Sequence, residues 1–72
     1  MKKVLIFGAG SIGNHMSKAC ISIGWQVHIT DISNKALERM RNQIYPSRYG
    51  RWDNNIIQVS FDNAFKLKNK FD

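Results

Sequence analysis

The period of the hydrophobic positions changes twice near the start of the chain. Residues 4–7 form a continuous apolar run that ends at Gly8, a pattern typical of a strand buried in a parallel sheet. From residue 12 the apolar positions recur at helical spacing, and Gly24 favours a helix end because glycine adopts the left-handed conformation without a side-chain clash. Residues 25–30 then alternate apolar and polar side chains, which predicts a second strand.

The helix predicted between these strands has two distinct faces. The apolar face, which we expect to be buried, comprises Ile12, Met16, Ala19, Cys20 and Ile23. The polar face comprises Asn14, His15, Ser17, Lys18 and Ser22. On this pattern Cys20 is an inert core thiol rather than a nucleophile.

A second helix follows, and its end is expected at a proline. Ser33 or Asn34 can cap its start, and its apolar positions are Leu37, Met40 and Ile44. Pro46 should end this helix because proline disfavours helical geometry at the residue before it. Residues 46–54 are therefore predicted to form a loop.

The last third of the chain repeats the strand–helix order. A short strand is predicted at residues 56–59, and Ser60 is placed to cap a final helix. That helix would bury, to differing extents, Phe61, Ala64, Phe65, Leu67 and Phe71.

The alternation of strands and helices predicts an α/β fold with a parallel sheet. Right-handed crossovers set the three strands in the order 3-2-1, so residues 1–72 form one partial domain, the first half of a doubly wound sheet that stops before strand 4. The apolar strand at residues 4–7 then lies at an edge, where unpaired N–H and C=O groups invite further pairing. We therefore expect self-association through this edge.

Composition and charge narrow the class of protein. The 72 residues carry a net charge of +6 and are 43% hydrophobic, within reach of a small folded domain. A single cysteine excludes an internal disulfide, and no apolar run is long enough to cross a membrane. The apolar start resembles a secretory signal, but glycines interrupt it, so we expect a cytoplasmic protein.

The strongest chemical signal is the glycine-rich turn after the first strand. Residues 8–13 read Gly-x-Gly-x-x-Gly between a predicted strand and a predicted helix, which is the dinucleotide-binding fingerprint. Gly8 permits the tight turn, Gly10 lets the backbone approach a pyrophosphate, and Gly13 lets the helix pack against the strand. The predicted cofactor contacts are Gly8, Ala9, Gly10, Ser11, Ile12, Gly13, Asp31 and Ile32.

Asp31 favours NAD over NADP as the cofactor. It ends the second strand, where the fingerprint places an acid that accepts hydrogen bonds from the adenosine ribose. Its carboxylate would repel a 2′-phosphate by roughly 4 kcal/mol per charge pair at about 4 Å and an effective dielectric near 20, before screening. Lys35 lies close enough to soften this preference.

Other candidate chemistry is weaker. The segment at residues 39–52 interleaves arginines with aromatic residues, as in some nucleic-acid-binding surfaces. Such charges more often solvate a face, and here they could also lie near an anionic cofactor or substrate. His15 and His28 have no metal-ligand partner at suitable spacing, so we predict no metal site.

The chain resembles the N-terminal cofactor domain of NAD(P)-dependent oxidoreductases, and most closely the Gfo/Idh/MocA family of sugar and cyclitol dehydrogenases. The similar segments are residues 3–13, 27–31, 36–40 and 44–53. The resemblance implies a Rossmann fold and NAD binding. The family's catalytic lysine and its substrate domain match nothing in this chain, so we expect no catalytic residue here and no hydride transfer by the chain alone. A non-catalytic NAD-binding regulatory or sensor module is the alternative.

Overall fold

The computed structural model describes residues 2–71, which fold as alternating strands and helices. The elements are β1 (Lys3–Phe7), α1 (Ser11–Ser22), β2 (Gln26–Thr30), α2 (Asn34–Arg39), the π-helix η1 (Met40–Ile44), α3 (Tyr45–Tyr49), β3 (Ile56–Gln58), α4 (Phe61–Leu67) and the 3-10 helix η2 (Lys68–Lys70).

The three strands form one parallel sheet, as predicted. The spatial order is β1-β2-β3, which places β1 and β3 at the edges. Val4 pairs with Val27 across the first ladder, and Val27 pairs with Ile56 across the second. The fold is therefore the half of a doubly wound α/β sheet that the strand–helix order indicates.

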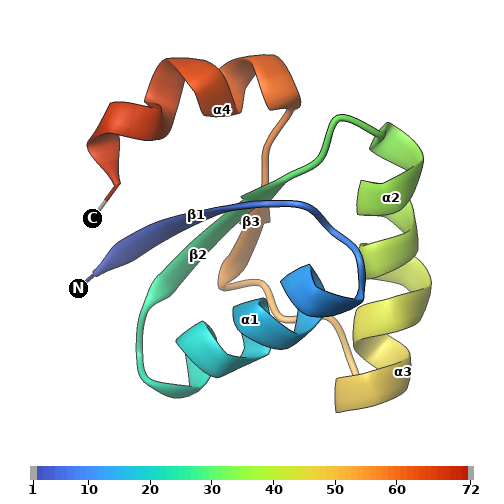
Figure 1. Ribbon diagram of the computed structural model, residues 1–72. Helices are drawn as coiled ribbons and strands as arrows, with labels where there is room; N and C mark the ends of the chain where they lie inside the picture. The colour runs from blue at the N-terminus through green and yellow to red at the C-terminus, as the bar shows by residue number, and fades with distance from the viewer. Residues whose placement is uncertain (1, 72) are drawn as a thin grey trace.

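The helices form two layers about the sheet. Figure 1 shows α1, α2 and α3 on one face and α4 on the other. Right-handed connections account for this change of face. After β3 the chain turns back toward β1, and a right-handed connection in that direction crosses the opposite side of the sheet. On the α4 face, Phe7 meets the rings of Phe61 and Phe65 at 6.0 Å, and His28 meets Phe71 at 5.0 Å.

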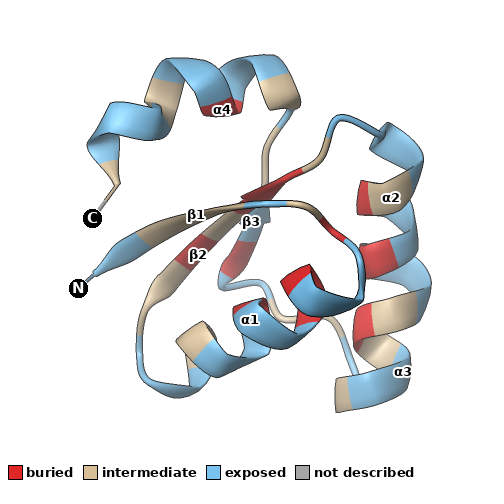
Figure 2. Ribbon diagram, viewed as in Figure 1, coloured by how far each residue is buried: buried red, intermediate tan, exposed pale blue. Residues whose placement is uncertain are grey.

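The hydrophobic core lies between the sheet and the three helices α1–α3, as the buried segments in Figure 2 show. Alternation along β2 sends Val27 and Ile29 into this core, and both are fully buried. Their buried partners are Ala9, Leu37, Met40, Tyr45 and Ile56.

The prediction for the faces of α1 is wrong. Ile12 is 76% exposed and Ile23 62% exposed, whereas Asn14 and Ser17 are fully buried. The buried face is rotated by about one residue, or 100°. Small residues line it because the helix starts next to the glycine turn and packs closely on the strands, as described below. Cys20 is only partly buried and carries a free thiol.

The predicted helix end at Pro46 is also wrong, because residues 45–49 form α3 rather than a loop. The helix widens ahead of the proline into η1, where the Tyr45 N–H donates to the Met40 carbonyl five residues back. This wider turn accommodates the ring, and Tyr45 keeps helical angles (φ −63°, ψ −49°). The helix ends instead at Gly50, which has φ +92°.

Both predicted serine caps are confirmed. The Ser33 hydroxyl accepts from the Ala36 N–H at 3.2 Å, and the Ser60 hydroxyl accepts from the Asn63 N–H at 3.3 Å. In α4, Ala64 is buried and Phe65 is 49% exposed.

Among residues 2–71, no helix has the length and apolar character needed to span a bilayer. A cytoplasmic location remains a prediction.

Candidate functional site

The glycine turn joins β1 to α1 at the carboxyl ends of the strands. The Gly8 N–H donates to the Thr30 carbonyl at 2.7 Å, so the turn starts from the β1–β2 ladder. Gly8 has φ +115°, a backbone conformation that is strained for any residue with a side chain. A Cβ at Gly13 would overlap the Gly8 carbonyl oxygen and lie 3.4 Å from Ile29 Cδ1. The turn and the helix are therefore in direct backbone contact, which requires glycine at position 13.

Gly10 serves a different purpose from Gly8 and Gly13. A Cβ at this position would meet nothing within 4 Å, so packing inside the protein does not require glycine. Gly10 is exposed and lines a surface hollow over the turn, described below. Absence of a side chain at Gly10 thus keeps the backbone accessible, as the fingerprint predicts.

Asn14 fastens the turn to the helix, a role that the sequence pattern did not reveal. Its Nδ2 donates to the carbonyls of Ala9 at 3.0 Å and Gly10 at 2.7 Å. The first N–H groups of α1 lie at the positive end of the helix dipole. No side chain caps them, and the first turn contains no acid. The result is a backbone donor set suited to an anion.

Asp31 turns toward the glycine turn, as the sequence predicts. Its Oδ2 accepts from the Ala9 N–H at 2.9 Å, and its Oδ1 accepts from the Ser33 N–H at 2.8 Å. These two bonds, the Ala9 bond first, lower the pKa of the carboxyl below its usual range, against a smaller opposing effect of burial. Asp31 is therefore ionised at neutral pH, and each oxygen retains a lone pair for a further donor.

Two adjoining hollows follow the turn. One, of about 500 Å³, lies over Gly8, Gly10, Ser11 and the exposed side chain of Ile12. The second, of about 290 Å³, lies beside Asp31 and Ile32, which is 82% exposed. Phe7 and Gly8 line both hollows, so together they trace one groove from the start of α1 to the end of β2. Seven of the eight predicted cofactor contacts line this groove. The eighth, Ala9, is 1% exposed and belongs to the hydrophobic core, so it lies beneath the turn rather than on the groove surface.

Arg48 belongs to the basic segment that could lie near an anionic cofactor, but its contact with the start of α1 was not predicted. It comes from α3, and its guanidinium donates to the Ser11 hydroxyl at 2.8 Å and the Ser11 carbonyl at 3.2 Å. The prediction of a loop at residues 46–54 concealed this contact, since only a helix continued past Pro46 brings Arg48 to the start of α1.

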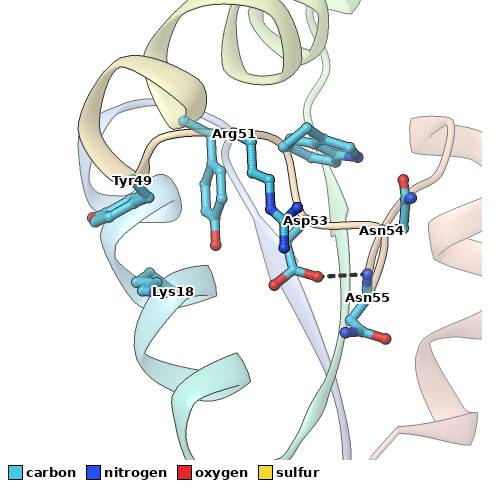
Figure 3. Close-up of a pocket in the computed structure, with 8 residues that line it drawn as sticks. Lys18, Tyr49, Arg51, Asp53, Asn54 and Asn55 are labelled. Atoms are coloured by element: carbon cyan, nitrogen blue, oxygen red, sulfur yellow. Dashed lines mark hydrogen bonds between the residues drawn. The ribbon is translucent and has the colours of Figure 1, made fainter.

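A third hollow, of about 520 Å³, lies at the other end of the strands (Figure 3). Lys18 of α1, Tyr49 of α3 and Arg51 on the loop before β3 line it, and the Asp53 carboxylate there accepts from the Asn55 N–H at 2.8 Å. Although it is as large as the hollow over the glycine turn, it has no glycine turn and no helix start, so the groove is the better candidate.

The aromatic rings of the basic segment pack against one another. Tyr45 is 1% exposed and packs on Tyr49 at 4.7 Å and Trp52 at 5.4 Å. Arg41 stacks over Trp52 at 5.5 Å. These contacts turn the rings inward, which favours a structural role over nucleic-acid binding.

The two histidines and the cysteine do not line either hollow of the groove. Burial, with the Lys3 charge as a smaller cause, lowers the pKa of His28 below its usual value, which favours the neutral ring. Within residues 2–71 no cluster of three or more His, Cys, Asp or Glu side chains could hold a metal ion.

The fold and the groove together define a dinucleotide-binding domain of the Rossmann type. The sequence model of the family described as 3-hydroxyacyl-CoA dehydrogenase, NAD binding domain, matches residues 3–66, and the chain belongs to this family. Its cofactor is NAD. Searches of curated proteins and of solved structures found no match. No comparison supports membership of the Gfo/Idh/MocA family, so that resemblance holds at the level of the NAD-binding Rossmann fold.

Proposed function

We propose that the groove binds the ADP half of NAD and thereby serves an NAD-dependent oxidoreductase. The backbone N–H groups of Ser11, Ile12 and Gly13 hold the pyrophosphate, which approaches over Gly10. Asp31 accepts hydrogen bonds from the adenosine ribose. The remaining contacts come from Gly8 and the exposed apolar side chain of Ile32, whereas Ala9 acts from within the core by holding Asp31 through its N–H.

The observation that carries this proposal is the hydrogen bond from the Ala9 N–H to Asp31 Oδ2. It joins the acid at the end of β2 to the glycine turn, so the two halves of the fingerprint face one groove. Because the carboxylate is ionised and keeps an acceptor site on each oxygen, it suits a pair of ribose hydroxyls. The same charge opposes the 2′-phosphate of NADP.

Calorimetric titration with NADH, NADPH and ADP-ribose tests this assignment. Wild type should bind NADH and ADP-ribose, and bind NADPH more weakly. Asp31→Asn should weaken NADH binding about tenfold, because a charge-assisted acceptor is lost, and should narrow the gap between the two cofactors. Asp62→Asn, an equal charge change in the first turn of α4, is the matched control and should leave both affinities unchanged. A folded wild-type chain that binds neither NADH nor ADP-ribose contradicts the proposal.

The substrate of the oxidoreductase is a separate question. The name of the family indicates a 3-hydroxyacyl-CoA. The sugar or cyclitol class depends only on the resemblance that includes residues 44–53, and it remains a prediction. Assay of NADH formation by a protein that contains this chain, with a 3-hydroxyacyl-CoA and with a cyclitol, distinguishes the two classes. We propose no catalytic residue within the 72 residues.

A further inference from the structure

Arg48 makes two hydrogen bonds to a single residue of the glycine turn, 37 positions earlier in the chain. Its two terminal nitrogens reach the hydroxyl and the carbonyl of Ser11 at 2.8 and 3.2 Å. Arg48 is exposed, and within residues 2–71 it forms no ion pair with a carboxylate. An exposed arginine held by two bonds to a serine, without a counter-charge, calls for a physical reason.

The electrostatics of the position supply one. Ser11 is the first residue of α1, where the helix dipole places a partial positive charge. A cation beside this end is unfavourable by itself, and α1 has no acid in its first turn to balance it. The charge of the guanidinium and the partial positive charge at the helix start therefore repel each other. An anion bound between them would relieve this repulsion.

The hydrogen bond to Ser11 also directs the serine hydroxyl. A hydroxyl has one hydrogen to donate and two lone pairs. Because Oγ accepts from Arg48, its own hydrogen remains for another acceptor. Ser11 lines the hollow over the glycine turn, where that acceptor would be a ligand oxygen.

We propose that Arg48 is a positioning residue for the cofactor's pyrophosphate. It fixes Ser11 as a hydroxyl donor toward a phosphate oxygen, and it adds a fixed positive charge at the start of α1. This inference rests on the proposed function, since it assumes that the pyrophosphate lies over the turn. It also gives residues 45–49 a role, because the helix that continues past Pro46 presents Arg48.

The test compares Arg48→Gln with Arg51→Gln, a matched loss of an exposed arginine that lines the third hollow instead. Arg48→Gln should weaken NADH and NADPH binding by the same factor, about tenfold, and Arg51→Gln by less than about twofold. The loss for Arg48→Gln should shrink as salt rises, because exposed charges are screened. Arg48→Lys should recover part of the affinity by restoring the charge without the fork.

A double-mutant cycle with Ser11→Ala separates action through the serine from a direct effect. If Arg48 acts in part through Ser11, Arg48→Gln should cost clearly less than tenfold when the hydroxyl is already absent, and the remaining cost reports the positive charge at the start of α1. A full tenfold cost in that background overturns the positioning role, and so does equal behaviour of the Arg48 and Arg51 variants. A loss confined to NADPH would mark Arg48 as a reader of the 2′-phosphate and overturn the inference.

Failure of the proposed function gives a different result. In that case wild type itself shows no NADH binding, and both proposals fall together. Circular dichroism of each variant establishes that the fold is retained, and Arg48→Lys provides the test should Arg48→Gln not fold.

Discussion

At the scale of single residues, the site depends on the difference between two glycines in one turn. Gly13 is required by packing, because a side chain there would strike the Gly8 carbonyl. Gly10 faces open space, so any requirement for glycine there comes from outside the chain. Folding and binding thus place separate demands on adjacent parts of one motif.

This difference predicts opposite effects of two alanine substitutions. Gly13→Ala should lower the free energy of unfolding by about 1–3 kcal/mol, the usual cost of overpacking. Gly10→Ala should change it by less than about 0.5 kcal/mol but should abolish detectable NADH binding. Urea unfolding and NADH titration of both variants check this. Equal stability losses in the two variants would contradict the assignment.

Asp31 predicts how stability depends on pH. Its pKa in the folded chain is lowered, chiefly by the Ala9 N–H, so its contribution is fully present above the pKa of the unfolded chain. That contribution is lost as the pH falls below about 4 and through the folded pKa. Asp31→Asn should therefore show a shallower loss of stability as the pH falls below about 4 in urea unfolding. An unchanged slope would mean that these hydrogen bonds do not persist in solution.

At the scale of elements, α1 shows what the hydrophobic pattern could and could not reveal. The glycine fingerprint and the two serine caps were predictable because each depends on local residue types. The strand order was predictable because right-handed crossovers fix it once the order of strands and helices is known. The buried face of α1 was not, because a close helix–sheet contact through Gly13 selects small polar residues over large apolar ones. Asn14 pairs its amide with turn carbonyls that periodicity does not register.

The continuation of the helix past Pro46 was also beyond the pattern. Proline rules describe α-helical spacing, whereas η1 shifts one turn to the wider π spacing just before the ring. As a result the contact between Arg48 and Ser11, which joins two distant elements, could not be predicted from the sequence.

The two faces of α1 predict a clear contrast in stability. Asn14→Ala should cost about 1–3 kcal/mol, because two turn carbonyls lose their buried donor. Ile12→Ser should cost less than about 0.5 kcal/mol, since Ile12 is 76% exposed. Thermal or urea unfolding measures both. A larger loss of stability for Ile12→Ser than for Asn14→Ala would mean that the buried face of α1 is the one that the hydrophobic periodicity predicts.

At the scale of the whole molecule, one exposed apolar patch lies beside β1. Within residues 2–71 this strand pairs only with β2, and Phe7, Ile12 and Met16, which line one hollow, are each at least 48% exposed. An apolar edge strand next to an exposed apolar helix face is a site for association. We propose that a second chain pairs along β1, as the strand order led us to expect.

Hydrogen exchange tests this association. The Gly8 N–H bonds to β2, so strand alternation places the N–H groups of Leu5 and Phe7 on the open edge. These two amides should become protected as the protein concentration rises, in parallel with a larger sedimentation coefficient. A monomer at all concentrations, with Leu5 and Phe7 exchanging freely, would contradict the proposal.

The most direct test of NAD binding in the groove is amide chemical-shift mapping by NMR during titration with NADH. The account predicts that the largest shifts fall on residues 8–13 and on Asp31 and Ile32, on both sides of the groove. Shifts absent from the glycine turn, or confined to the hollow around Lys18, Arg51 and Asn55, would contradict it.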